Sequence, residues 1–193
     1  SIVGLAIDYL TRMMLGASAE EAFEVSLKGA RLIGRGEHAK ALEMVDSLRR
    51  KDGDALLDEE GIRFACRLSG YDVAYRRGKQ DFKPVDGIDP DERTVADIRL
   101  MAARSASFFS GQGSDIVSGF TLHGGMTDKL EAGDGDYVAG GTLWDLKCSK
   151  RKPSAEHTLQ VICYWLAGMR SRQGEFADIE AVGLFNPLLN KAW

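Results

Sequence analysis

Residues 133–148 read Gly-Asp-Gly-Asp-Tyr-Val-Ala-Gly-Gly-Thr-Leu-Trp-Asp-Leu-Lys-Cys, and this stretch organises the rest of the chain. Two short strand-like runs flank the Gly-Gly pair, which is a typical signal for a β-hairpin. If Gly140 and Gly141 are the two turn residues, Ala139 pairs with Thr142 and the pairing of the remaining residues follows by counting outward. The stretch therefore predicts an antiparallel hairpin whose register is set by its turn.

This register collects charged side chains on one face of the hairpin. Because side chains alternate along a strand, one face carries Asp134, Asp136, Asp145 and Lys147, and the other carries Tyr137, Trp144, Leu146 and Cys148. Directly opposed carboxylates repel each other, and a bound divalent cation is a common reason for such a pair. A solvated acidic face is the alternative, but the apolar opposite face favours a hairpin inside the fold.

Composition indicates an ordinary globular protein. The chain has 193 residues, 44% of them hydrophobic and 28% charged, and a net charge of −4. A nucleic-acid partner would therefore need a local basic patch. We recognise no signal peptide and no apolar run of membrane-spanning length, so no membrane partner is expected. Three cysteines without a CxxC spacing are typical of free thiols in a reducing compartment, and we expect a cytoplasmic protein.

The first eighty residues are predicted to be helical. Apolar periodicity and end signals predict helices over 2–15, 18–33, 37–50 and 55–68, with one or two further turns before Arg77. Ser18 and Glu21 have the spacing of a capping box. The loop at 78–90 is rich in turn residues and is the expected boundary. We therefore expect a helical region at 1–78 packed on a core at 89–193, together forming one compact unit.

The core is predicted to have a mixed central sheet flanked by helices, in the α/β (α+β) class. Asp89 is the expected N-cap of a helix that ends near Ser110. A strand at 116–123, the hairpin, a helix from 154 to 170 and a strand at 179–185 follow. The later helix indicates a crossover between parallel strands. Its predicted apolar stripe consists of Leu159, Ile162, Cys163, Leu166 and Met169.

The ordered set Gly133-x-x-Asp136, Asp145-x-Lys147 and Gln160-x-x-x-Tyr164 resembles the PD-(D/E)xK nucleases, in particular their RecB-like exonuclease branch. Asp-x-Lys alone is a weak signal, but the ordered set with matching elements between its members is far more specific. The resemblance covers roughly the second half of the chain. It implies a restriction-endonuclease-like core.

The resemblance also implies roles for these residues. Asp136 and Asp145 would ligate one or two Mg²⁺ or Mn²⁺ ions, and the backbone carbonyl of Leu146 would complete the metal site. Lys147 would orient the attacking water, and an ammonium beside carboxylates is expected to remain charged. Gln160 and Tyr164, four residues apart on one helix face, would position water or substrate. The implied function is a Mg²⁺-dependent deoxyribonuclease that hydrolyses phosphodiester bonds, with exonuclease action favoured.

The chain departs from the resemblance at two places. Many RecB-like members place a His in a helix ahead of the core, where this chain has Asp8, which is either a further metal ligand or an exposed helix residue. Some relatives hold an iron–sulfur cluster with four cysteines. The three cysteines here argue against such a cluster.

Local cations are the candidates for contact with a DNA substrate. Lys150, Arg151 and Lys152 directly follow the catalytic strand and are placed to contact phosphates, although a solvated loop is the alternative. Arg99 and Arg104 on the preceding helix are further candidates.

Two other functions remain open. One is a catalytically inactive module on the same fold that binds nucleic acid or protein. The other is a glycoside hydrolase, for which opposed carboxylates would also serve. The lysine on the same face and the absence of an aromatic-rich cleft count against the hydrolase, and dependence of activity on a metal would discriminate between these functions.

Overall fold

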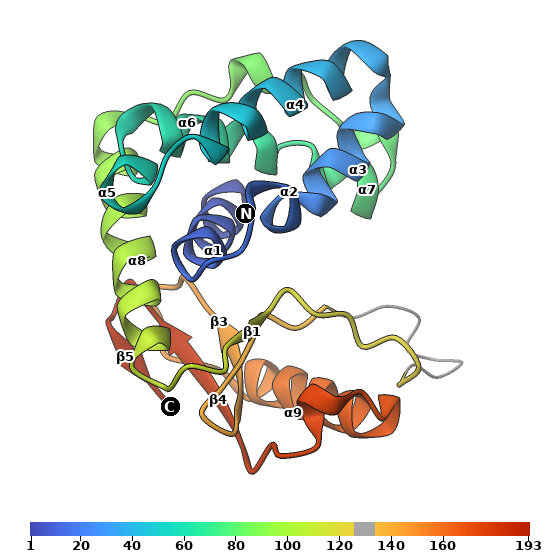
Figure 1. Cartoon of the computed structure of the whole chain (residues 1–193), viewed down its shortest axis with the longest axis vertical. Helices are drawn as coiled ribbons and strands as arrows, with labels where there is room; N and C mark the ends of the chain where they lie inside the picture. Colours follow the sequence, from blue (N-terminus) through green and yellow to red (C-terminus); the bar gives the residue numbers. More distant parts are fainter. Residues whose placement is uncertain (126–133) are drawn as a thin grey trace. The chain divides into compact units, whose positions relative to one another are not determined.

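The computed structural model describes residues 1–125 and 134–193 of the chain (Figure 1). Gly133, the first residue of the nuclease-like motif, lies outside the described residues. The chain divides into two compact units, Ser1–Ala103 and Arg104–Trp193. The division falls inside helix α8 (Glu92–Ser110) rather than in the loop at 78–90.

The two ends of α8 have different partners, which explains where the division falls. In the first unit, Arg99 donates a hydrogen bond to the carbonyl of Leu57 over 2.8 Å. In the second unit, Phe108 stacks on Phe185 with ring centroids 4.0 Å apart. Because α8 contributes side chains to both units, the boundary between the units falls within this helix and not in the loop before it.

The first unit is built from helices, as predicted. They are α1 (Ile2–Met14), α2 (Ala19–Ala22), α3 (Glu24–Ile33), α4 (Arg35–Arg49), α5 (Gly53–Leu56), α6 (Glu59–Ser69) and α7 (Asp72–Arg76), followed by the 3-10 turns η1 (Lys79–Asp81) and η2 (Val85–Gly87). The capping box is confirmed, because the Glu21 N–H donates to Ser18 Oγ over 3.2 Å and the Ser18 N–H donates to the Glu21 carboxylate over 2.9 Å.

Two of the predicted helices are each two helices in the structure. The helix expected over 18–33 is interrupted at Phe23, whose side chain is fully buried. The helix expected over 55–68 is interrupted at Asp58, which caps α6 by accepting a hydrogen bond from the Gly61 N–H over 2.7 Å. At Phe23 the burial of a large ring prevails over the helical periodicity of the sequence. At Asp58 a local helix cap does so.

A buried carboxylate joins three helices of the first unit. Asp72 of α7 accepts hydrogen bonds from the Tyr9 hydroxyl of α1 over 2.5 Å and from the Ser26 hydroxyl of α3 over 2.6 Å. Burial raises the pKa of Asp72, and burial together with the Asp72 charge raises the pKa of Tyr9. The network satisfies polar groups that would otherwise be costly to bury.

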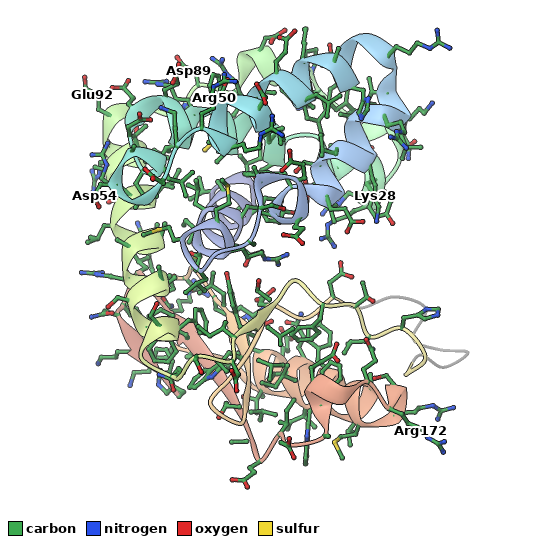
Figure 2. The ribbon with its side chains drawn as sticks, viewed as in Figure 1. Lys28, Arg50, Asp54, Asp89, Glu92 and Arg172 are labelled. Carbon is green, nitrogen blue, oxygen red and sulfur yellow. The ribbon has the colours of Figure 1, made fainter. Side chains whose placement is uncertain are left out.

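The predicted N-cap of α8 is wrong by two residues. Asp91, not Asp89, accepts a hydrogen bond from the Thr94 N–H, over 2.7 Å. Asp89, labelled in Figure 2, instead forms an ion pair with Arg63 of α6. The C-terminal end of α8 at Ser110 agrees with the prediction.

The second unit contains the predicted mixed sheet. Its strands are β1 (Val117–Ser118), β2 (Tyr137–Ala139), β3 (Thr142–Leu146), β4 (Ala181–Asn186) and β5 (Lys191–Ala192), in that spatial order. Strands β3 and β4 are parallel and the other neighbouring pairs are antiparallel. Helix α9 (Ala155–Ser171) makes the crossover between the parallel strands, and the 3-10 turn η3 (Gly174–Phe176) follows it. Strand β5 was not predicted.

The predicted register of the hairpin is confirmed. Tyr137 pairs with Trp144, Val138 with Leu143 and Ala139 with Thr142. The turn residues Gly140 and Gly141 have φ angles of 56° and 68°. Two consecutive positive φ angles define the tight hairpin turn that glycine favours.

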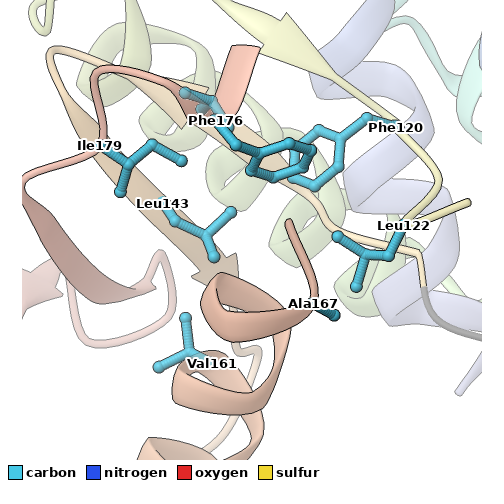
Figure 3. Close-up of a cluster of buried hydrophobic side chains, with 8 residues drawn as sticks. Phe120, Leu122, Leu143, Val161, Ala167, Phe176 and Ile179 are labelled. Atoms are coloured by element: carbon cyan, nitrogen blue, oxygen red, sulfur yellow. The ribbon is translucent and has the colours of Figure 1, made fainter. Parts of the chain in front are cut away.

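The two faces of the sheet pack against different helices. On one face, Tyr137 stacks on Phe109 of α8 with ring centroids 4.0 Å apart. On the other face, side chains from the sheet, α9 and the connecting segments form one apolar cluster (Figure 3), which consists of Phe120, Leu122, Val138, Leu143, Val161, Ala167, Phe176 and Ile179. Among the described residues, no helix is both long enough and apolar enough to span a membrane.

The predicted inward stripe of α9 is wrong, because it lies on the outer face of the helix. Leu159, Leu166 and Met169 are 62%, 58% and 48% exposed. The buried positions of α9 are Val161, Ala167 and Gly168. Val161, Ala167 and Gly168 face the sheet, with Tyr164 and Trp165 packed beside them, so the longest run of aliphatic side chains selected the wrong face.

We predict opposite effects for two glycine-to-alanine substitutions. A Cβ added at Gly168 would lie 2.3 Å from the buried Phe176 ring, so Gly168→Ala should lower the free energy of unfolding by about 1–3 kcal/mol. Gly36→Ala in α4 meets no atom within 4 Å and should raise that free energy by up to about 1 kcal/mol. Urea unfolding checks both, and equal effects at the two positions would contradict the packing described at Gly168.

Candidate active site

Four of the predicted site residues form a continuous chain of polar contacts. Lys147 Nζ lies 2.8 Å from Asp145 Oδ2 and donates a hydrogen bond to Gln160 Oε1 over 2.9 Å. Gln160 Nε2 in turn donates to the Tyr164 hydroxyl over 2.7 Å. The structure therefore brings together side chains from the end of β3 and from one face of α9.

Asp145 is the most buried charged group of this site. It is only 4% exposed, although the sequence placed it on a polar face. Leu146 and Cys148, for which the sequence favoured burial, are only half-buried. The α9 side of the sheet thus encloses the carboxylate, and a buried carboxylate requires the ammonium group that Lys147 supplies.

Asp136 is held beside the same strand by a main-chain contact. Its Oδ2 accepts a hydrogen bond from the Leu146 N–H over 2.7 Å. The next N–H along the chain, that of Lys147, donates in the opposite direction to the Phe185 carbonyl of β4 over 2.9 Å. Because the N–H and C=O of one strand residue point to the same side, the Leu146 carbonyl points away from β4, toward the side that holds Asp136.

Local structure explains why these residues converge. Alternation along β3 puts Asp145 and Lys147 on the face covered by α9. Gln160 and Tyr164 are four residues apart and share a helix face. Helix α9 begins after Ser154, whose N–H donates to His157 Nδ1 over 3.1 Å. His157 therefore helps to cap the N-terminus of α9.

The donor set fits a hard divalent cation. Two carboxylates and one backbone carbonyl are oxygen ligands of the kind that Mg²⁺ and Mn²⁺ prefer. No group of three or more His, Cys, Asp or Glu side chains suited to a metal occurs in the described part of the chain. A cation at Asp136 and Asp145 would therefore complete its coordination with the Leu146 carbonyl and water, as Mg²⁺ commonly does.

Asp8 lies in the first unit. The sequence allowed either a metal ligand or an exposed helix residue at this position, and the structure shows that the residue is not exposed. It is buried and forms an ion pair with Arg12, one turn later in α1, with 2.5 Å between Arg12 Nη2 and Asp8 Oδ2. A metal-ligand role for Asp8 stays a prediction.

The candidate substrate cations fall into two groups. The loop after β3 carries three exposed cations that a phosphate group can reach, Lys150, Arg151 and Lys152. Arg104 donates hydrogen bonds to the carbonyls of Pro187 and Leu188 over 3.0 and 3.2 Å. Arg104 therefore supports a turn, as Arg99 does through Leu57, and a substrate contact by either arginine stays a prediction.

Sequence reasoning missed Asn186. This buried residue donates from Nδ2 to the Ser149 carbonyl over 2.7 Å. Its Oδ1 accepts hydrogen bonds from the N–H groups of Leu188 and Leu189 over 3.0 and 3.1 Å. Asn186 thus joins the cationic loop to the turn after β4. The only sequence signal is the Asn186-Pro187 pair, which marks the end of the predicted strand.

Comparisons of the chain with protein-family models, with curated proteins and with solved structures find no match.

We predict strong energetic coupling between Asp145 and Lys147. Lys147→Met should lower the free energy of unfolding by about 1–3 kcal/mol, because it removes the ammonium group beside a buried carboxylate. Adding Asp145→Asn to that variant should recover part of this loss, because no buried charge then remains in the pair. Urea unfolding of the single and double variants measures the coupling, and simple additivity of the two effects would contradict it.

Proposed function

We propose that this chain is a metal-dependent nuclease of the PD-(D/E)xK type, close to the RecB-like exonucleases. The observation that carries the proposal is the position of Lys147, within 2.8 Å of Asp145 and 2.9 Å of Gln160. In addition, Asp136 is bound to the main chain one residue after Asp145. Such an arrangement supports hydrolysis of a phosphodiester, for which a carboxylate-held cation and an oriented water are needed.

The element order of the second unit supports a restriction-endonuclease-like core. The last turns of α8 precede three antiparallel strands, a crossover helix and a fourth strand parallel to the third. The polar residues lie where β3 ends and the crossover begins. Ligands commonly bind at the carboxyl ends of strands in sheets that contain parallel crossovers.

Each residue then has a distinct task. Asp136, Asp145 and the Leu146 carbonyl hold Mg²⁺ or Mn²⁺, which supplies charge neutralisation and activation of water. Lys147, paired with Asp145, acts as a cation that orients the attacking water and balances negative charge on the phosphate. Gln160 fixes the Lys147 ammonium, and Tyr164 fixes the Gln160 amide.

DNA is the favoured substrate, with exonuclease action favoured over internal cleavage. The chain is acidic overall, with a net charge of −4, so phosphate contacts must be local. The exposed loop of Lys150, Arg151 and Lys152 directly follows the strand that carries Asp145 and Lys147. Asn186 and Ser149 position the start of this loop.

We expect cleavage of end-labelled linear DNA with Mg²⁺ or Mn²⁺ and none with EDTA. Asp145→Asn should lower the cleavage rate at least about 100-fold, since it removes a metal ligand. Asp178→Asn, which changes an exposed aspartate at the other end of the sheet, is the matched control and should cleave like the wild type.

Metal binding can be measured without cleavage. Mn²⁺ should raise the melting temperature of the wild type by mass action and have a smaller effect on Asp136→Asn. A folded wild type that binds DNA equally well with Mn²⁺ or EDTA, and cleaves with neither, would overturn the nuclease proposal in favour of an inactive binding module.

We predict a phosphate contact for Arg151. Arg151→Glu should weaken DNA binding and flatten the dependence of affinity on salt, because fewer counterions are released. Fluorescence anisotropy at several salt concentrations measures both, with EDTA present to prevent cleavage. Arg31→Glu, an equivalent change at an exposed arginine of the first unit, is the control. An unchanged salt slope for Arg151→Glu would remove the loop from the substrate site.

A further inference from the structure

Helix α9 has an apolar outer face in addition to the buried face that packs on the sheet. Leu159, Leu166 and Met169 are among the most exposed large hydrophobic side chains of the described residues, and Ile162 and Cys163 between them are half-buried. We call these five residues the outer stripe. The apolar cluster in Figure 3 uses Val161 and Ala167 of the same helix, so the outer stripe is additional to the core.

The spacing of the outer stripe makes it a continuous surface. Its members recur at intervals of three and four residues, which places them on one side of a helix over about three turns. An apolar stripe of this length on a helix that already packs on a sheet is typical of an interaction surface.

The stripe is nearly palindromic about the midpoint between Ile162 and Cys163. Leu159 and Leu166 lie at equal distances on either side of that midpoint. Two antiparallel copies of α9 would therefore place Leu159 of one copy against Leu166 of the other. A surface that complements itself in this way is what a two-fold symmetric dimer requires.

Opposite charges lie near the two ends of the stripe, and they are centred on Cys163, half a residue from the midpoint of the two leucines. Glu156 is exposed in the first turn of α9, and Arg170 is exposed in the last. They lie about 21 Å apart along one helix, too far for contact within a copy. In the antiparallel pair, Glu156 of one copy approaches Arg170 of the other, so the opposite charges attract each other. The antiparallel orientation also places the helix dipoles in opposite directions, which is favourable.

We propose that the outer stripe of α9 binds a second copy of this chain in antiparallel orientation and forms a homodimer. One helix pair provides an interface at the small end of the range for specific complexes, so the dissociation constant should be about micromolar. The proposal depends on the exposed face of α9 and not on nuclease activity.

Analytical ultracentrifugation of the full chain over a range of concentrations tests the proposal. The wild type should change from monomer to dimer across the micromolar range. Leu166→Glu should remain monomeric, because it places a charge in the apolar contact between the two stripes. Leu42→Glu, at a leucine of α4 that is 44% exposed, is the matched control and should dimerise like the wild type. Circular dichroism confirms that the variants are folded.

Charge reversal and cross-linking test the orientation of the two copies. Glu156→Arg and Arg170→Glu should each weaken the dimer at least several-fold, and the double variant should restore it. A short bis-maleimide should join two copies through Cys163, which lies next to the two-fold axis, and Cys163→Ser should abolish that product. Cys66, buried and with its pKa raised to about 11 by that burial, should not react in the folded chain.

A wild type that stays monomeric at every concentration would overturn the proposal, as would a dimer that survives Leu166→Glu. If the double variant dimerises no more tightly than the two single variants, the antiparallel arrangement is overturned. These outcomes can be read whether or not the chain cleaves DNA.

Discussion

A carboxylate that is only 4% exposed, Asp145, lies at the end of the central strand β3, and much of the surrounding structure follows from its need for a counter-charge. Lys147 supplies that charge from the same face of the strand, 2.8 Å away. The ammonium group also needs an acceptor, which Gln160 of α9 provides. Removing the Lys147 charge alone is costly, because the Asp145 carboxylate remains buried. The Asp145–Lys147 ion pair and the Lys147–Gln160 hydrogen bond together link the strand to the helix and bring the proposed chemistry into one place.

The local parts of this arrangement could be predicted from the sequence. A Gly-Gly turn determines a hairpin register through backbone angles, and strand alternation then assigns Asp145 and Lys147 to one face. The mixed sheet followed from a helix between two strands. Signals of this kind involve neighbouring residues, so they do not depend on what the element later contacts. The capping box at Ser18 was predictable for the same reason.

The errors occurred where distant residues decide the outcome. The face of α9 was misassigned because Gly168, Gln160 and Tyr164 contact the sheet side, while leucines remain outside. The hydrogen bonds from Arg104 to the carbonyls of Pro187 and Leu188 could not be predicted, because these residues lie more than eighty positions along the chain. Asn186 carried no periodic signal, although its three hydrogen bonds hold the loop beside the site. Single polar residues that connect loops become visible only when the tertiary structure brings the loops together.

The parallel pairing of β3 with β4 has a consequence for the order of events during synthesis. The proposed site residues, from Asp136 to Tyr164, all leave the ribosome before β4, which begins at Ala181. Strand β3 nevertheless lies in the middle of the sheet, and the Phe185 carbonyl of β4 accepts the N–H of Lys147, the residue that follows β3. A nascent chain that already carries every site residue therefore lacks the neighbour that positions them. Any activity of the site must therefore wait until β4 has emerged and paired with β3.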